Sequence, residues 1–222
     1  MREIALYYVN TDSIAGLDID ELMSRERLRR ADALGGVKRL SSKAAEVCLC
    51  AALMDAGEMP PARYEYAADG SPVLSAPRGV YMSLAHTGSM AACALSEIPV
   101  GIDVEAVRRV ARGMAQRIAA AWEAVPEGHC AAIRLWTQKE AVIKLRPEGG
   151  GTMRSFGVRY PDVVTEDGTV AATLQTLWAD GCWQTVAAAE PFGLRAVKLE
   201  RGDVELMLAR ARNLRGFCTH DA

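Results

Sequence analysis

The segment VGIDVE, from Val100 to Glu105, carries two acids in an otherwise apolar run. Side chains alternate across a strand, so the apolar residues share one face, which we expect to be core, and Gly101, Asp103 and Glu105 share the other. The two acidic side chains start about 7 Å apart, twice the rise per strand residue, so their carboxylates can converge on one cation. Gly101 leaves room for another group to approach the backbone. The alternative is a solvated polar face of a half-buried strand.

A second acidic segment lies further along the chain, in WTQKEAVIK from Trp136 to Lys144. On a helix, Glu140 and Lys144 are neighbours on one side, with Trp136 one turn before. The alternative is an exposed ion pair beside a packed tryptophan. Mg²⁺ takes one or two carboxylates together with phosphate and water oxygens. A metal site at the two strand acids therefore needs a third ligand or a phosphate-bearing substrate, and Glu140 is the candidate third carboxylate.

The composition limits the class of protein. The 222 residues suit one large domain or two small ones, and the net charge of −2 gives no support for nucleic-acid binding. We see no signal peptide and no segment of about 18 apolar residues that could span a membrane. Six scattered cysteines and three histidines form no convincing zinc set, so we expect reduced thiols in a cytoplasmic protein.

The order of apolar runs and stops predicts an α+β chain, because helices separate from runs of strands. We expect helices over residues 19–33, 42–56, 107–124, 131–145 and 203–214, with Gly35 and Gly36 ending the first and Asp203 capping the last. We expect strands over residues 3–9, 64–67, 80–85, 91–95, 98–104, 155–160, 170–178, 183–188 and 194–199, and a turn at residues 69–72.

Together, VGIDVE and WTQKEAVIK resemble the signature of the phosphopantetheinyl transferases, in which Gly-x-Asp-x-Glu precedes Trp-x-x-Lys-Glu-x-x-x-Lys. The similarity is to the larger type that activates peptide and polyketide synthases. Other motifs fall in family order up to about residue 160: SRERLRR with Lys43, DGSP (69–72), SLAHT (83–87) and GGGTMRSFGVRY (149–160).

The resemblance implies transfer of 4′-phosphopantetheine from coenzyme A to a serine of an apo acyl, peptidyl or polyketide carrier protein, with release of adenosine 3′,5′-bisphosphate. It implies Mg²⁺, with Mn²⁺ as an alternative ion, held by Asp103, Glu105 and Glu140. The implied fold has two similar α+β subdomains in a pseudo-two-fold arrangement, residues 1–98 contacting the nucleotide and residues 99–222 carrying the acids and the catalytic helix. A monomer would then suffice.

Further positions follow from the same resemblance. Lys144 would contact phosphate near the reaction centre, with Lys139 assisting, although Lys139 could instead lie on a solvated helix face. The nucleotide end of coenzyme A would be held by residues that match the family's binding positions: Arg27, Arg30, Lys43, Ser71, His86 and Thr87. A histidine after a strand is also often structural, and SRERLRR also suits an ordinary charged helix surface.

Two roles remain alternatives. Glu123 lies where relatives place a glutamate proposed as the base, or it is a surface helical acid. Arg108, Arg109, Arg112 and Arg117 could face an acidic carrier helix, or form a solvated helix face.

The sequence departs from the family pattern at two positions and leaves other functions open. Ala85 and Ser71 replace a serine and a lysine, and each loss could weaken coenzyme binding by about 1 kcal/mol or more. The competing functions are a Mg²⁺-dependent phosphoesterase or nuclease, and a non-catalytic homologue that binds coenzyme A or a carrier protein.

Overall fold

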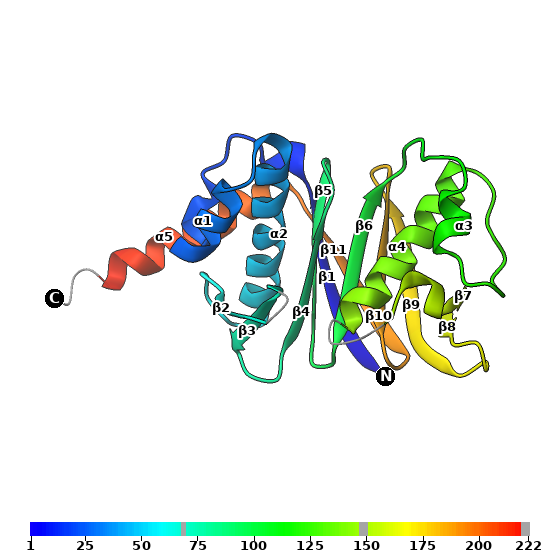
Figure 1. Ribbon diagram of the computed structural model, residues 1–222. Helices are drawn as coiled ribbons and strands as arrows, with labels where there is room; N and C mark the ends of the chain where they lie inside the picture. The colour runs from blue at the N-terminus through cyan, green and yellow to red at the C-terminus, as the bar shows by residue number, and fades with distance from the viewer. Residues whose placement is uncertain (68–69, 147–150, 219–222) are drawn as a thin grey trace.

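The structure is a computed structural model that describes residues 1–67, 70–146 and 151–218. Within these residues the strands form a four-stranded sheet, a five-stranded sheet and a two-stranded ribbon (Figure 1). The ribbon pairs β2 (Arg63–Tyr66) with β3 (Pro72–Ala76). Helices lie outside the two larger sheets, so the predicted α+β class is confirmed.

The first sheet has the strand order β11-β1-β5-β4. Its members are β11 (Phe192–Leu199), β1 (Arg2–Asn10), β5 (Met90–Ser96) and β4 (Tyr81–His86). The long helix α2 (Gly36–Asp55) packs against one face of this sheet, where its buried residues join Tyr7 and Val9 in a common core.

The second sheet has the order β6-β10-β9-β8-β7. Its members are β6 (Val100–Ala106), β10 (Cys182–Ala188), β9 (Val170–Ala179), β8 (Asp162–Val164) and β7 (Gly157–Arg159). Helix α4 (His129–Leu145) packs on one face of this sheet, and the short helix α3 (Met114–Ile118) packs on α4.

A second apolar core lies between the two sheets and joins them. It contains Ile4 and Leu6 from β1 together with Val100, Ile102 and Val104 from β6. The molecule is therefore layered helix, sheet, sheet, helix, with α2 and α4 on the outside (Figure 1). The predicted core face of VGIDVE is confirmed, and its acidic face points toward α4.

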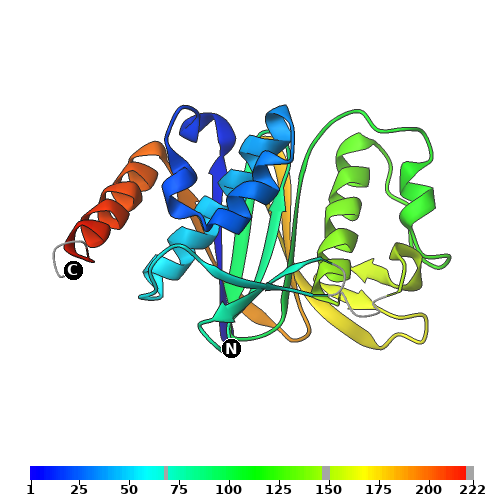
Figure 2. The same cartoon turned by 60° about the vertical axis from the view of Figure 1, so that its left-hand side comes forward.

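The last elements of the chain return to the first sheet. Strand β11 runs parallel to β1, and α5 (Arg201–Cys218) packs on the 3₁₀ turns η1 (Thr11–Ile14) and η2 (Ile19–Leu22). Figures 1 and 2 place α5 on the opposite side of the molecule from α4. The expected subdomain boundary at residue 98 precedes β6, and that boundary and the pseudo-two-fold arrangement stay predictions.

Several predicted helix bounds are wrong. Residues 19–33 form η2 and then α1 (Arg25–Asp32), because the Ser24 hydroxyl caps a new helix by accepting the Arg27 N–H. Gly35 does not end a helix but precedes α2, which starts six residues earlier than expected. Residues 107–124 are mostly irregular, because Gly113 adopts φ +79° and only α3 follows it.

Smaller differences occur elsewhere. Strands β3 and β8 were not predicted, and Ser155 ends the 3₁₀ turn η3 (Met153–Ser155) rather than starting a strand. Helix α5 begins at Arg201, and Asp203 accepts the Glu200 N–H from inside the helix. Asp69 of the predicted turn, and Gly149 and Gly150 of the glycine-rich motif, lie outside the described residues. Within the described part of the chain, no helix is long and apolar enough to cross a membrane.

Candidate active site

The position of the site is set by a close contact between β6 and α4. A Cβ added at Gly101 would lie 2.0 Å from the carbonyl oxygen of Ala141 and 2.5 Å from the backbone nitrogen of Leu145. Only glycine allows the helix backbone to come this near the strand. Gly101 thus makes room for helix α4. The contact fixes this helix beside Asp103 and Glu105, which follow Gly101 on β6.

Asp103 is buried under α4, with only 6% of its surface exposed. One of its oxygens, Oδ1, accepts a hydrogen bond from the Lys144 ammonium at 2.7 Å. The other, Oδ2, is buried and has no hydrogen-bond partner among the described residues. Burial raises the pKa of Asp103 to about 6; Lys144 opposes this rise, and the charges of Glu105 and Glu140 add to it.

The two other acids lie nearer the surface. Glu105 forms an ion pair with Arg108 at 2.7 Å, and Glu140 is partly exposed on α4. Asp103 feels the charges of both, so the three predicted ligands form one negatively charged region. Carboxylates and an unpartnered buried oxygen suit a hard divalent ion. As they stand, however, no three His, Cys, Asp or Glu side chains in residues 1–67, 70–146 and 151–218 are arranged to hold a metal.

Lys139 and Glu123 contact each other rather than the three predicted metal ligands. The Lys139 ammonium is 2.7 Å from Glu123 and donates to the carbonyls of Met153 and Phe156, and its side chain is fully buried. Glu123 also accepts backbone N–H groups from Ala120 and Val158. Burial lowers the pKa of Lys139, while Glu123 acts in the opposite direction.

This arrangement bears on three expectations from the sequence. Lys139 lies neither on a solvated face nor beside the acids, and Glu123 is neither on a helix nor at the surface, since its side chain is 5% exposed. Lys144 pairs with Asp103 across the strand–helix contact rather than with Glu140 one turn away.

His86 ends strand β4, and Thr87 follows it in the turn to β5. The His86 Nδ1 lies 3.2 Å from the Ser41 hydroxyl on α2. Desolvation and then the positive charges of Lys144, Arg27 and Lys38 lower the pKa of His86. Three cations therefore act on this imidazole.

Lys38 and Ser41 near His86 are not among the residues predicted from the sequence. The predicted helix spans residues 42–56, with Ser41 or Ser42 at its start, so Lys38 lies outside it. Reading the helix from Gly36 would have placed Lys38 and Ser41 one turn apart on the same helix face.

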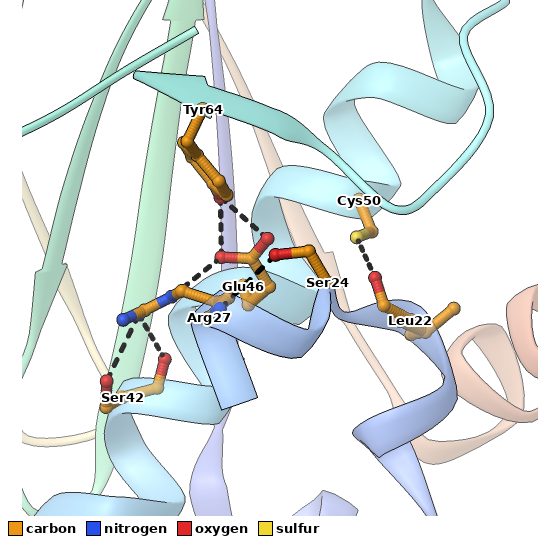
Figure 3. Close-up of polar contacts among 7 residues, drawn as sticks. All are labelled: Leu22, Ser24, Arg27, Ser42, Glu46, Cys50 and Tyr64. Atoms are coloured by element: carbon orange, nitrogen blue, oxygen red, sulfur yellow. Dashed lines mark hydrogen bonds and ion pairs between the residues drawn. The ribbon is translucent and has the colours of Figure 1, made fainter. Parts of the chain in front are cut away.

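Arg27 is held by a buried polar cluster (Figure 3). Its Nε donates to Glu46 at 3.0 Å, and its terminal nitrogen donates to the carbonyl and hydroxyl of Ser42. The Tyr64 hydroxyl donates to the same Glu46 carboxylate at 2.6 Å. Glu46 is fully buried, and burial raises its pKa despite these partners. Arg27 therefore serves the packing of α1 on α2.

The other expected coenzyme contacts also have protein partners. Arg30 lies 3.5 Å from the centre of the Tyr66 ring, and Lys43 is paired with Asp20 at 2.7 Å and Asp32 at 3.0 Å. Ser71 precedes β3, and its carbonyl accepts the Ala67 N–H. The partners of Arg30 and Lys43 lie on β2, η2 and α1, away from the acids of β6.

Comparisons with known proteins give one family model and two named relatives. A family model described as the 4′-phosphopantetheinyl transferase superfamily matches residues 99–196, from the start of β6 into β11. Two relatives, each named 4′-phosphopantetheinyl transferase AcpT, from Salmonella typhi and Salmonella typhimurium, are each 35% identical over 138 residues, covering 58% of this chain and 68% of the relative.

The chain belongs to the 4′-phosphopantetheinyl transferase superfamily. It is a 4′-phosphopantetheinyl transferase, a class of enzyme that acts on carrier proteins with coenzyme A and a divalent metal. The matched part of this transferase contains Asp103, Glu105, Glu140 and Lys144, whereas His86 lies before it.

Proposed function

We propose that this transferase moves 4′-phosphopantetheine from coenzyme A to a serine of an apo acyl, peptidyl or polyketide carrier protein. The serine oxygen attacks the phosphorus next to pantetheine, and a new P–O bond forms. The bond from that phosphorus to the bridging oxygen breaks, releasing adenosine 3′,5′-bisphosphate, and the serine proton passes to a base or to solvent. Such a reaction depends mainly on positioning and on neutralising phosphate charge.

One observation carries this proposal: Asp103 and Glu105 share a strand face, and Gly101 locks Glu140 and Lys144 against that face. We assign Asp103, Glu105 and Glu140 as the residues that would hold Mg²⁺ or Mn²⁺. When bound, the ion would neutralise the diphosphate oxygens and stabilise the leaving group. Lys144 supplies a point charge to the phosphate from the chain itself.

We assign the nucleotide end of coenzyme A to the region around His86 and Thr87. The positive charges that lower the pKa of His86 would be neutralised by a phosphate, which supports this placement. Lys38 and Ser41 join the expected contacts there. Arg27, Arg30 and Lys43 already contact Glu46, Tyr66 and Asp20, so their contribution to coenzyme binding rests on the resemblance alone, as does that of Ser71.

We leave the base unassigned rather than give it to Glu123. Both Glu123 oxygens are occupied, by the Lys139 ammonium and by backbone N–H groups. A carboxylate that neutralises a buried ammonium cannot take a proton without leaving that charge uncompensated.

The carrier would approach beside β6, where four arginines lie within residues 107–117. An acidic carrier helix would be drawn to these charges, which speeds encounter more than it deepens affinity. Reversal of Arg109 and Arg112 to glutamate should slow carrier modification and leave coenzyme A affinity unchanged. Unchanged rates would remove this surface from the proposal. We further propose that the protein acts as a cytoplasmic monomer.

The direct test is the intact mass of an apo carrier protein after incubation with this protein, coenzyme A and Mg²⁺. Transfer adds one phosphopantetheine, about 340 Da. Glu140→Gln and removal of the divalent ion should each abolish the gain. Bound coenzyme A without mass gain on acyl, peptidyl and aryl carriers would support the non-catalytic homologue instead.

A further inference from the structure

The ion pair between Lys144 and Asp103 lies where the divalent ion would bind. Lys144 Nζ is 2.7 Å from Asp103 Oδ1, and the side chains are 33% and 9% exposed. An ammonium at this distance occupies one of the two oxygens that Asp103 could offer to a metal. The second oxygen, Oδ2, has no partner within the described residues.

The backbone around this pair is held in place. Gly101 lies two residues before Asp103 and touches the backbone of Leu145, the residue after Lys144. The strand and the helix therefore cannot separate at this point without breaking a backbone contact. Only the flexible four-carbon stem of Lys144 is free to carry the ammonium elsewhere.

The pair of Lys144 and Asp103 is surrounded by further acids. Glu105 and Glu140 both act on Asp103, and the exposed Arg108 pairs with Glu105. Lys144 is the cation that contacts the buried carboxylate, so it reduces repulsion among the three acids. A divalent ion bound to the same carboxylate would repel the ammonium.

We propose that Lys144 is a resident counter-ion of Asp103 that competes with the divalent ion until coenzyme A is bound. A coenzyme phosphate gives the ammonium a new anionic partner, so Lys144 leaves Asp103 and the carboxylate is exposed to the metal. This inference rests on the proposed function for the identity of the phosphate ligand. It makes metal and coenzyme binding positively coupled, and such coupling is reciprocal.

The test measures Mn²⁺ binding, by electron paramagnetic resonance of free Mn²⁺, with and without saturating coenzyme A. In the unaltered protein, coenzyme A should tighten Mn²⁺ binding by about 5-fold or more, the lower range of allosteric coupling. In Lys144→Gln, Mn²⁺ should bind about 5-fold or more tightly without coenzyme A, and coenzyme A should add much less. Asp103→Asn should abolish Mn²⁺ binding in both proteins, which locates the ion.

Lys198→Gln is the matched control, because Lys198 also pairs with an acid but its partners are Asp180 and Glu200, outside the site. It should behave as the unaltered protein does. Lys144→Met is the second variant if Lys144→Gln does not fold. The proposal is overturned if both Lys144 variants bind Mn²⁺ without coenzyme A no more tightly than the unaltered protein, or if no protein binds Mn²⁺ at all.

The carrier mass assay separates this result from the proposed function. Mass gain on the carrier together with unchanged Mn²⁺ binding in the Lys144 variants rejects only the counter-ion role. No mass gain together with tighter Mn²⁺ binding in those variants rejects the transfer reaction and supports the competition.

Discussion

Two lysines of helix α4, Lys139 and Lys144, each hold a carboxylate at 2.7 Å, yet the two ion pairs differ in almost everything else. The Lys139 ammonium is fully buried and has two carbonyl acceptors besides Glu123. Lys144 is one-third exposed, and its partner Asp103 keeps an oxygen without a hydrogen bond inside the described part of the chain.

The pair of Lys139 and Glu123 stabilises the fold, whereas Lys144 and Asp103 can each take another partner. A buried charge is tolerated only where its hydrogen-bonding groups are satisfied, and Lys139 meets that condition. A carboxylate with a spare oxygen near other acids is instead suited to bind a cation. The flexible lysine beside it is suited to bind a phosphate. The two pairs should therefore respond differently to the loss of one partner.

The largest effect is expected at the buried pair. Glu123→Ala leaves the Lys139 ammonium buried without a counter-ion and should lower the free energy of unfolding by about 3–5 kcal/mol. Lys144→Ala should cost no more than about 2 kcal/mol, because Asp103 has a pKa of about 6 and can take up a proton. Urea unfolding followed by tryptophan fluorescence measures both. Equal losses would contradict the distinction between the pairs.

The next effect concerns the contact that places Lys144 over Asp103. Gly101→Ala would put a Cβ within 2.0 Å of the Ala141 carbonyl oxygen, so the helix must shift, at a cost of about 3 kcal/mol. The control is Gly202→Ala, because a Cβ at Gly202 meets no atom of the described residues within 4 Å. Thermal unfolding of the two variants compares them, and similar melting temperatures would mean that α4 can move freely on β6.

The sequence predicted the acidic strand face and the helix with Glu140 and Lys144, because both depend on local periodicity and on a motif read over adjacent residues. It also predicted correctly that Gly101 admits a close neighbour. What it could not supply was the partner of each charge. Lys144 pairs with Asp103, 41 positions away, and Lys139 pairs with Glu123, 16 positions away. Both pairs form because of how α4 packs in the fold, which local sequence does not determine.

The wrong predictions have local causes. The segment 107–124 is predicted as one helix, but Gly113 takes a left-handed conformation and Val107 continues the pairing of β6 with β10 through the Gly181 carbonyl. Two adjacent glycines favour a helix stop, but Gly35 precedes α2 here, so the predicted start of that helix is wrong. That error concealed Lys38 and Ser41 near His86.

A smaller and more specific effect is expected at His86. The charge of Lys144 lowers the pKa of this histidine, so Lys144→Gln should raise it toward 6.5, since removing a nearby cation favours the protonated ring. Histidine resonances followed by NMR across pH measure the change, with His86→Gln to assign the signal. Lys198→Gln should leave the pKa of His86 where it is in the unaltered protein. An unchanged pKa in Lys144→Gln would place Lys144 too far from the imidazole to share a phosphate with it.

The smallest effect is expected at the exposed pair of Arg108 and Glu105. Arg108 is 54% exposed, so water and salt screen its charge and the pair contributes little to stability. Arg108→Gln should change the free energy of unfolding by less than about 1 kcal/mol, and the change should shrink further in high salt. Urea unfolding at low and high ionic strength tests both statements. A salt-independent loss as large as that of Glu123→Ala would show that Glu105 depends on its arginine, and the acids of β6 would then need two resident cations rather than Lys144 alone.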